Sequence, residues 1–142
     1  LKLNYSLDYH PDLHSYFTAE APQSFLSLLE LKEFQQLISQ FTGAKISTLN
    51  CEASYFSNKN YTLLSDKQKI KEGIAFFLDF NSFKKEFGGY TVLVKNKNNL
   101  IQQPIQNSIL LVKQSKHQRS FIKYVNHLAK DQKRFILKGV LM

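Results

Sequence analysis

The sequence contains few of the residues that cross-link, kink or anchor a chain. Its 142 residues include one cysteine, one methionine, three prolines and no tryptophan. A single cysteine, Cys51, excludes an internal disulfide framework and suits a reducing compartment, so we expect a cytoplasmic protein. No apolar run approaches the roughly 20 residues that a membrane-spanning helix requires, and we expect no membrane partner.

Short motifs of common enzyme classes are also missing. There is no glycine-rich phosphate loop, no GxSxG turn, no HExxH helix and no CxxC pair. A nucleophilic Cys51 would need a histidine beside it, and none lies nearby in sequence, so a buried strand thiol is the favoured interpretation. His10 and His14 have the spacing of a metal pair on a helix, but Pro11 and Asp12 between them indicate a turn.

The composition is that of one globular domain with a basic surface. Twelve phenylalanines, seven tyrosines and 43% hydrophobic residues are enough for a core in a single domain over residues 1–142. The net charge is +8, and a strongly basic balance is common among nucleic-acid-binding proteins. The lysines, however, are scattered through turn-like segments such as 95–99, where they solubilise strand edges. A solvated basic surface is therefore favoured over a nucleic-acid interface.

The first third of the chain predicts one helix after a short β segment. Residues 1–22 alternate loosely around Pro11, which indicates one or two strands with a loop. Over 23–41 the apolar residues recur at three- and four-residue spacing, which is typical of an amphipathic helix. Pro22 precedes this segment and Gly43 follows it, as expected at the two ends of a helix.

The remainder, residues 46–142, predicts a β core. Short apolar segments follow one another at roughly 8–12-residue spacing, with turn residues such as Gly88-Gly89 between them. The candidate strands are Ile46–Phe56, Tyr61–Leu64, Gly73–Phe80, Tyr90–Lys95, Asn99–Ile105, Ser108–Lys113, Ser120–Val125 and Arg134–Leu141. We therefore predict a mostly β fold, a double-stranded β-helix (jelly roll), with one main supporting α-helix on its outside.

The order of these segments resembles a known enzyme core. The stretches LNCEASYFSNKNYTLLSD, GIAFFLDF, GGYTVLV, QQPIQNSILLV, SFIKYV and KRFILKGV succeed one another in the order seen in 2-oxoglutarate/Fe(II)-dependent dioxygenases. The resemblance is to the prolyl-hydroxylase-like branch that acts on ribosomal or other protein prolines, and it covers roughly residues 20–142. It implies an iron bound by a His-x-Asp pair and a distal histidine, and a basic residue that binds 2-oxoglutarate.

Residue by residue, the resemblance implies that the metal ligands are largely lost. Asp66 stands at the carboxylate of the His-x-Asp pair, but Leu64 stands where its histidine would be. Ser120 stands at the distal histidine position, with His117 three residues upstream. Asp66 and His117 are therefore predicted as vestigial metal ligands, and Leu64 and Ser120 as lost ones.

The resemblance also implies a retained co-substrate side. Arg134 begins the last strand, where the family places the residue that pairs with the distal carboxylate of 2-oxoglutarate. Tyr55 or Tyr61 would donate a second hydrogen bond. The alternative, that Arg134 is only a charge at a strand start beside Lys133, is equally favoured.

Three functional hypotheses follow. The first is a dioxygenase-like protein that has lost iron binding, needs no cofactor, and binds a protein or peptide partner in the old cleft. The second is an active protein hydroxylase that uses Fe(II) and 2-oxoglutarate through displaced ligands such as Asp66 with His117. The third is a basic nucleic-acid-binding β-domain.

Overall fold

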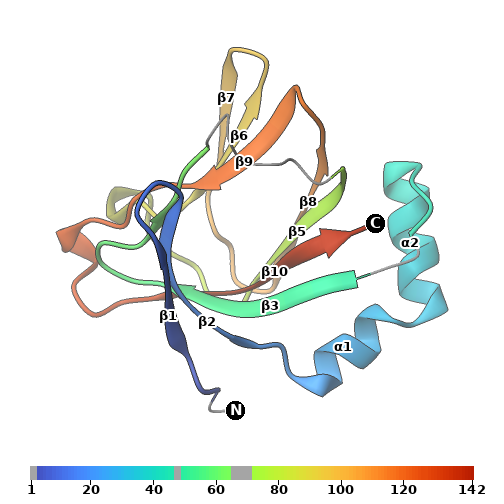
Figure 1. Cartoon of the computed structure of the whole chain (residues 1–142), viewed down its shortest axis with the longest axis horizontal. Helices are drawn as coiled ribbons and strands as arrows, with labels where there is room; N and C mark the ends of the chain where they lie inside the picture. Colours follow the sequence, from blue (N-terminus) through green and yellow to red (C-terminus); the bar gives the residue numbers. More distant parts are fainter. Residues whose placement is uncertain (1–2, 47–48, 65–71) are drawn as a thin grey trace.

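The computed structural model describes residues 3–46, 49–64 and 72–142. They form two facing β-sheets with two helices at one side of the larger sheet (Figure 1). The elements are β1 (Ser6–His10), β2 (His14–Glu20), α1 (Gln23–Leu29), α2 (Lys32–Thr42), β3 (Leu49–Phe56), β4 (Tyr61–Thr62), β5 (Gly73–Asp79), β6 (Thr91–Lys95), β7 (Asn98–Gln102), β8 (Ser108–Gln114), β9 (Gln118–Ile122) and β10 (Arg134–Leu141), with 3₁₀ turns at Lys85–Phe87 and His127–Ala129.

The larger sheet has the strand order β1-β2-β3-β10-β5-β8, with β4 paired to β2, and the smaller sheet has the order β7-β6-β9. All the pairings are antiparallel. The region of β4 connects the two sheets, because the Ile122 amide of β9 donates to Thr62 Oγ1 at 2.7 Å and the Val125 amide donates to the Asn60 carbonyl at 2.9 Å. The predicted jelly roll is confirmed.

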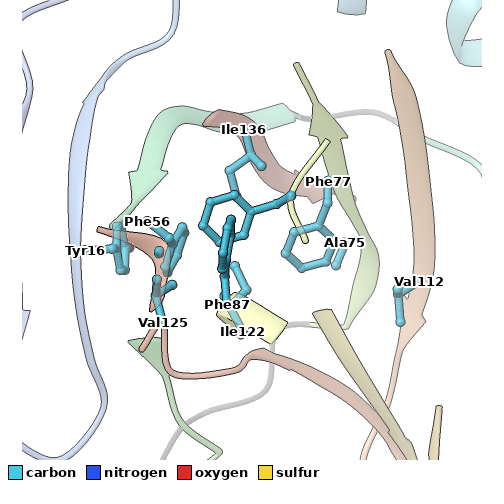
Figure 2. Packing of buried hydrophobic residues seen from close by; sticks show 11 residues of the cluster. Tyr16, Phe56, Ala75, Phe77, Phe87, Val112, Ile122, Val125 and Ile136 are labelled. Atoms are coloured by element: carbon cyan, nitrogen blue, oxygen red, sulfur yellow. The ribbon is translucent and has the colours of Figure 1, made fainter. Parts of the chain in front are cut away.

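Two apolar layers hold the structure together. The first fills the space between the sheets, where buried side chains from both meet (Figure 2): Tyr16, Phe56, Ala75, Phe77, Phe83, Phe87, Val112, Ile122, Val125, Ala129 and Ile136. The second lies on the outer side of the larger sheet under the helices and contains Leu29, Ile38, Ala53, Ile74, Phe76, Leu137 and Leu141. Because successive strand residues face opposite ways, each central strand supplies both layers.

The prediction of one continuous helix over 23–41 is wrong, because the structure divides it at Leu31. Leu31 is extended (φ −61°, ψ 134°) and precedes α2, whereas α1 ends at Leu29. From Leu29 to the next inward residue, Phe34, is five positions, or about 140° around a helix, so a straight helix would turn Phe34 away from the sheet. The break at Leu31 turns α2 relative to α1, so the apolar faces of both helices contact the larger sheet. The expected end is confirmed, since Gly43 caps α2 in the left-handed conformation (φ 71°).

The predicted strands correspond to β3–β10 with shifted ends, and β9 shows the largest correction. It spans Gln118–Ile122 rather than Ser120–Val125, because the chain leaves the small sheet after Ile122 to pair with the 59–60 turn through Val125. β4 is likewise limited to Tyr61–Thr62. The predicted β segment before Pro22 is the hairpin β1–β2.

Candidate functional site

A cleft of about 350 Å³ lies between the larger sheet and the β4–β9 side of the jelly roll. Its lining comes from six strands and the residue after β4, and mixes apolar groups with hydrogen-bonding side chains: Asn50, Glu52, Thr62, Leu63, Ala75, Phe76, Phe77, Gln114, Ser120, Phe121, Ile122, Lys138, Gly139 and Val140. The strands β3, β5, β8 and β10 supply one side, and β4 and β9 supply the other.

The charged pair of the cleft is Glu52 with Lys138. The two residues are directly opposite each other in β3 and β10, which places their side chains on the same face of the sheet. Lys138 Nζ lies 3.2 Å from Glu52 Oε1 and 3.7 Å from the centre of the Tyr16 ring, an ion pair combined with a cation–π contact. Tyr16 donates its hydroxyl to Glu52 Oε1 at 2.9 Å, and Thr18 donates to Oε2 at 3.0 Å.

This network shifts the protonation of its members in different directions. Burial alone would raise the pKa of Glu52, but the Lys138 ammonium and the hydrogen bonds from Tyr16 and Thr18 outweigh it and hold that pKa below its usual range. Burial lowers the pKa of Lys138, against the opposing effect of Glu52. Burial, with the nearby Glu52 carboxylate, raises the pKa of Tyr16. At neutral pH Tyr16 is therefore a neutral donor to a charged carboxylate.

The predicted metal positions are only partly assembled. Ser120 lines the cleft from β9, and Thr62 and Leu63 line it next to the half-buried Leu64. Asp66 lies outside the described residues, so its role as a ligand stays a prediction. His117 does not face the cleft but lies exposed in the turn between β8 and β9, where its carbonyl accepts from the Asn96 amide at 3.0 Å.

Among the residues that the structure describes, the donors at this cleft do not fit an Fe(II) site. Iron(II) in such sites prefers two imidazoles and a carboxylate on one face. Within the described residues no three His, Cys, Asp or Glu side chains are grouped for metal binding. Glu52, the one carboxylate among the described residues that line the cleft, already accepts from Tyr16, Thr18 and Lys138, and the Lys138 ammonium would repel a second cation.

Arg134 begins β10 as predicted, but its guanidinium is engaged inside the protein. Nε and Nη2 donate to the two carboxylate oxygens of Asp79 at 2.6 and 2.9 Å. Nη1 donates to the Gly89 carbonyl at 2.8 Å and to Thr91 Oγ1 at 3.0 Å. With 1% of the Arg134 side chain exposed, little of its hydrogen-bonding capacity is left for an incoming anion. The structure thus gives the prediction of 2-oxoglutarate binding by Arg134 no support.

The structure places Tyr55 and Tyr61 away from the cleft lining, so their role in binding 2-oxoglutarate stays a prediction. Tyr55 lies one residue from Ser54 and Phe56, whose side chains are buried between the sheets, so its ring is on the outer face of the larger sheet. There it stacks on Phe17, with ring centres 4.6 Å apart. Tyr61 contacts the Tyr124 ring, 6.1 Å away, and is absent from the cleft lining to which its neighbour Thr62 belongs.

Sequence reasoning missed two ion pairs, Glu52–Lys138 at the cleft and Asp79–Arg134 in the interior. Glu52 and Asp79 are each the one charged residue of their strands, and Lys138 shares β10 with Arg134. A charged residue at an inward position is rarely buried without a partner, and this is the signal that could have identified them. Their partners are not local, since Arg134 and Asp79 are 55 residues apart.

His10 and His14 are opposite each other across the β1–β2 turn, not on a helix. The Asp12 amide donates to His10 Nδ1 at 3.3 Å, and His14 Nε2 lies 2.8 Å from Asp8 Oδ1. No helix in the described part of the chain is long and apolar enough to cross a membrane.

Two facing antiparallel sheets around a cleft at one end define the class of the fold, which is the jelly roll of 2-oxoglutarate/Fe(II) oxygenases. The chain is similar to a Pseudomonas putida prolyl-4-hydroxylase (TM-score 0.68, 12% identity, covering 96% of this chain and 77% of that one). It is also similar to a prolyl hydroxylase from Trichoplax adhaerens in complex with a hypoxia-inducible-factor peptide fragment (0.71, 13%, 97% and 70%). A third likeness is to a 2OG-Fe(II) oxygenase family oxidoreductase from Burkholderia pseudomallei (0.69, 10%, 99% and 73%). At these identities the likeness shows the fold alone.

The family itself is shown by the sequence. A family model described as "Oxoglutarate and iron-dependent oxygenase degradation C-term" matches residues 11–141, nearly the whole chain. The chain belongs to this family.

Proposed function

We propose that this oxygenase-like jelly roll is a non-catalytic module that needs no metal or 2-oxoglutarate and binds a protein or peptide partner in its cleft. The observation that carries the proposal is the chemistry of the cleft lining. The cleft is lined by an ammonium–carboxylate pair, Lys138 with Glu52, and by the hydroxyl of Ser120. The proteins that share this fold are oxygenases. Such a lining suits hydrogen bonding to a polypeptide better than ligation of iron.

The state of Arg134 supports the same proposal. A 2-oxoglutarate carboxylate would have to displace Asp79 from a bidentate, buried pair, and would leave a buried carboxylate without its counter-ion. Loss of the co-substrate site and loss of the metal site are consistent with one another. The single thiol of Cys51 is consistent with a cytoplasmic location, which stays a prediction.

The first experiment tests loss of chemistry. The whole chain is titrated anaerobically with Fe(II) or Mn(II), with and without 2-oxoglutarate, by calorimetry, and succinate formation is then measured in air. An active prolyl hydroxylase is the positive control. We expect no saturable metal binding and no succinate. Micromolar metal binding with 2-oxoglutarate turnover would overturn the proposal in favour of an active hydroxylase.

The second experiment tests the cleft as a binding site. Random dodecapeptides displayed on phage are selected on the whole chain and then measured against two variants with the same added charge. Ser120→Arg fills the cleft from β9, whereas Asn99→Arg adds the charge on exposed β7 of the same sheet. We expect a group of selected peptides that loses binding to Ser120→Arg and keeps binding to Asn99→Arg. If no selected peptide loses binding to Ser120→Arg alone, the cleft is not a binding site.

A further inference from the structure

An aromatic stripe crosses the outer face of the larger sheet, on the side away from the cleft. Leu7, Phe17, Tyr55 and Phe135 are directly opposite one another in β1, β2, β3 and β10. Register partners share a face, so these four side chains form one continuous row. With adjacent strands about 4.8 Å apart, the row is about 14 Å long.

The stripe is not under the helices. The helices pack on the outer face farther along the same strands, over Ala53 and Leu137, whereas β1 lies to the left in Figure 1, away from both helices. Leu7 and Phe135, at the two ends of the row, are 56% and 37% exposed, and Phe17 and Tyr55 between them are half-buried. Exposed apolar side chains that are contiguous on one face, rather than scattered, are typical of an interaction surface.

The rings of the stripe are held in a fixed arrangement. Tyr55 stacks on Phe17 at 4.6 Å and lies 5.7 Å from Phe135, and Tyr5 packs edge-on against Tyr55 at 4.8 Å. Burial raises the pKa values of Tyr5 and Tyr55, so both hydroxyls remain protonated at neutral pH. The surface thus offers rigid ring faces and two hydroxyl groups able to donate.

A second hollow continues the stripe toward α1. It has a volume of about 310 Å³ and shares Tyr5 and Phe135 with the surface just described. The rest of its lining is apolar except for one amide: Leu3, Pro22, Phe25, Ala53, Phe80, Asn81 and Leu137. This hollow can accept an apolar ring from a ligand that lies along the stripe.

The charge at the stripe is positive. Lys133 is exposed, and its Nζ lies 4.6 Å from the centre of the Tyr55 ring. Its neighbour in sequence, Arg134, is neutralised by Asp79 inside the protein, whereas Lys133 faces solvent across an aromatic surface in a chain of net charge +8. A ligand with an acidic residue would be complementary at this point.

We propose that the aromatic stripe and its adjoining hollow bind an extended, proline-containing peptide that carries an acidic residue. The stripe runs across the strands through the middle of a sheet, where the backbone groups of β2, β3 and β10 are already paired, so a ligand cannot add as another strand. Extended proline-rich segments suit such a surface because they dock onto aromatic grooves with little loss of conformational entropy. At about 3.1 Å per residue, four or five residues span the stripe.

The test is fluorescence polarisation with a labelled nonapeptide of eight prolines and one central glutamate. Comparison peptides of the same length replace the prolines by alternating glycine and serine, or the glutamate by glutamine. We expect saturable binding of the proline–glutamate peptide, with weaker binding of both others. Absence of saturable binding at protein concentrations up to about 1 mM, which corresponds to about −4 kcal/mol, would overturn the proposal.

Variants locate the site. Tyr55→Ala at the centre of the stripe should weaken binding about tenfold or more, whereas Leu100→Ala, at a 63% exposed position on the other sheet, should leave it unchanged. Lys133→Glu is an exposed change that does not threaten folding. It should weaken binding of the glutamate peptide and strengthen binding of a peptide with lysine in its place.

A charge swap without effect, or equal loss in Leu100→Ala, would show that the peptide binds elsewhere. Sedimentation equilibrium tests the remaining possibility, that a second copy of the chain covers the stripe. A dimer that is lost in Leu7→Ser would mean that a second copy covers the stripe, which would also overturn the proposal. None of these outcomes depends on what the cleft binds.

Discussion

Replacement of Arg134 by methionine should destabilise the fold severely and reveal whether its guanidinium is structural or available to a ligand. Both members of the pair are buried, with 1% of Arg134 and 6% of Asp79 side chains exposed. Methionine keeps much of the aliphatic stem but leaves the Asp79 carboxylate without its counter-ion. Breaking a buried pair in this way costs about 3–5 kcal/mol.

That cost is large against the total stability of a domain, which is typically about 5–15 kcal/mol. Urea unfolding of the wild type and of Arg134→Met, followed by circular dichroism, measures the difference in the free energy of unfolding. Lys133→Met is the matched control. It changes an exposed neighbour, removes only a cation–π contact with Tyr55, and should shift stability by no more than about 1 kcal/mol.

The pH dependence of the stability deficit, the free energy of unfolding that Arg134→Met loses relative to the wild type, identifies its cause. Burial already raises the pKa of Asp79 above its usual 3.8, against the opposing hydrogen bonds and charge of Arg134. Without Arg134 that pKa rises further, so the folded variant binds a proton more readily than the unfolded chain does. Its stability therefore falls as the pH rises above about 3.8, and the deficit should be smallest in acid and largest at neutral pH.

Two results would refute this reasoning. A cost below about 1 kcal/mol would mean that the pair is dispensable, as expected if Arg134 were held ready for an anion. A rise in the melting temperature of the wild type with 2-oxoglutarate, absent in Arg134→Met, would show directly that the guanidinium binds the co-substrate.

Three further predictions concern the cleft strands. Because the folded-state pKa of Glu52 is lowered, its contribution to stability is present above its usual pKa of 4.5 and is lost as the pH falls below that value. Glu52→Gln should remove this part of the acid dependence of stability, measured by urea unfolding at several pH values. An unchanged acid profile would contradict the network around Glu52. Burial and the nearby Glu52 raise the pKa of Cys51 to about 11 from 9.0. Near pH 8 its thiolate fraction should therefore be about 100-fold below that of the unfolded chain. Iodoacetamide labelling in the absence and presence of urea measures this difference, and equal labelling rates would count against it. An added Cβ at Gly139 would overlap the Asn50 carbonyl oxygen of β3, so Gly139→Ala should cost about 1–3 kcal/mol in urea unfolding, and no measurable cost would show that β3 yields easily.

The sequence predicted the fold well because the fold depends on periodicity and turns. β10 begins and ends at the predicted bounds, Arg134 and Leu141. The break in the helix at Leu31 was missed because no proline or glycine marks it; it follows from how two short helices fit one sheet.

The site was predicted less well because its chemistry depends on pairs between distant strands. Alternation places Glu52 and Lys138 on the inward side, but their partnership follows from the register of β3 with β10. The same limit applies to Tyr55, whose hydroxyl was expected in the cleft although strand parity turns it outward.

The inward face of β10 explains why the cleft and the stripe should respond differently to salt. Arg134 and Lys138 lie four residues apart on that face, and each is matched by one carboxylate, Asp79 from β5 and Glu52 from β3. Among the described residues, these charges at and behind the cleft are thus neutralised within the protein, so a peptide bound there meets chiefly hydrogen-bonding and apolar groups of this part of the chain. Its affinity should vary little between low and physiological ionic strength.

Lys133 on the stripe has an exposed ammonium, so binding of the proline–glutamate peptide should weaken as salt screens that charge. Competition experiments at two salt concentrations separate the sites. Strong salt dependence at the cleft would mean that Lys138 exchanges Glu52 for a charged group of the ligand.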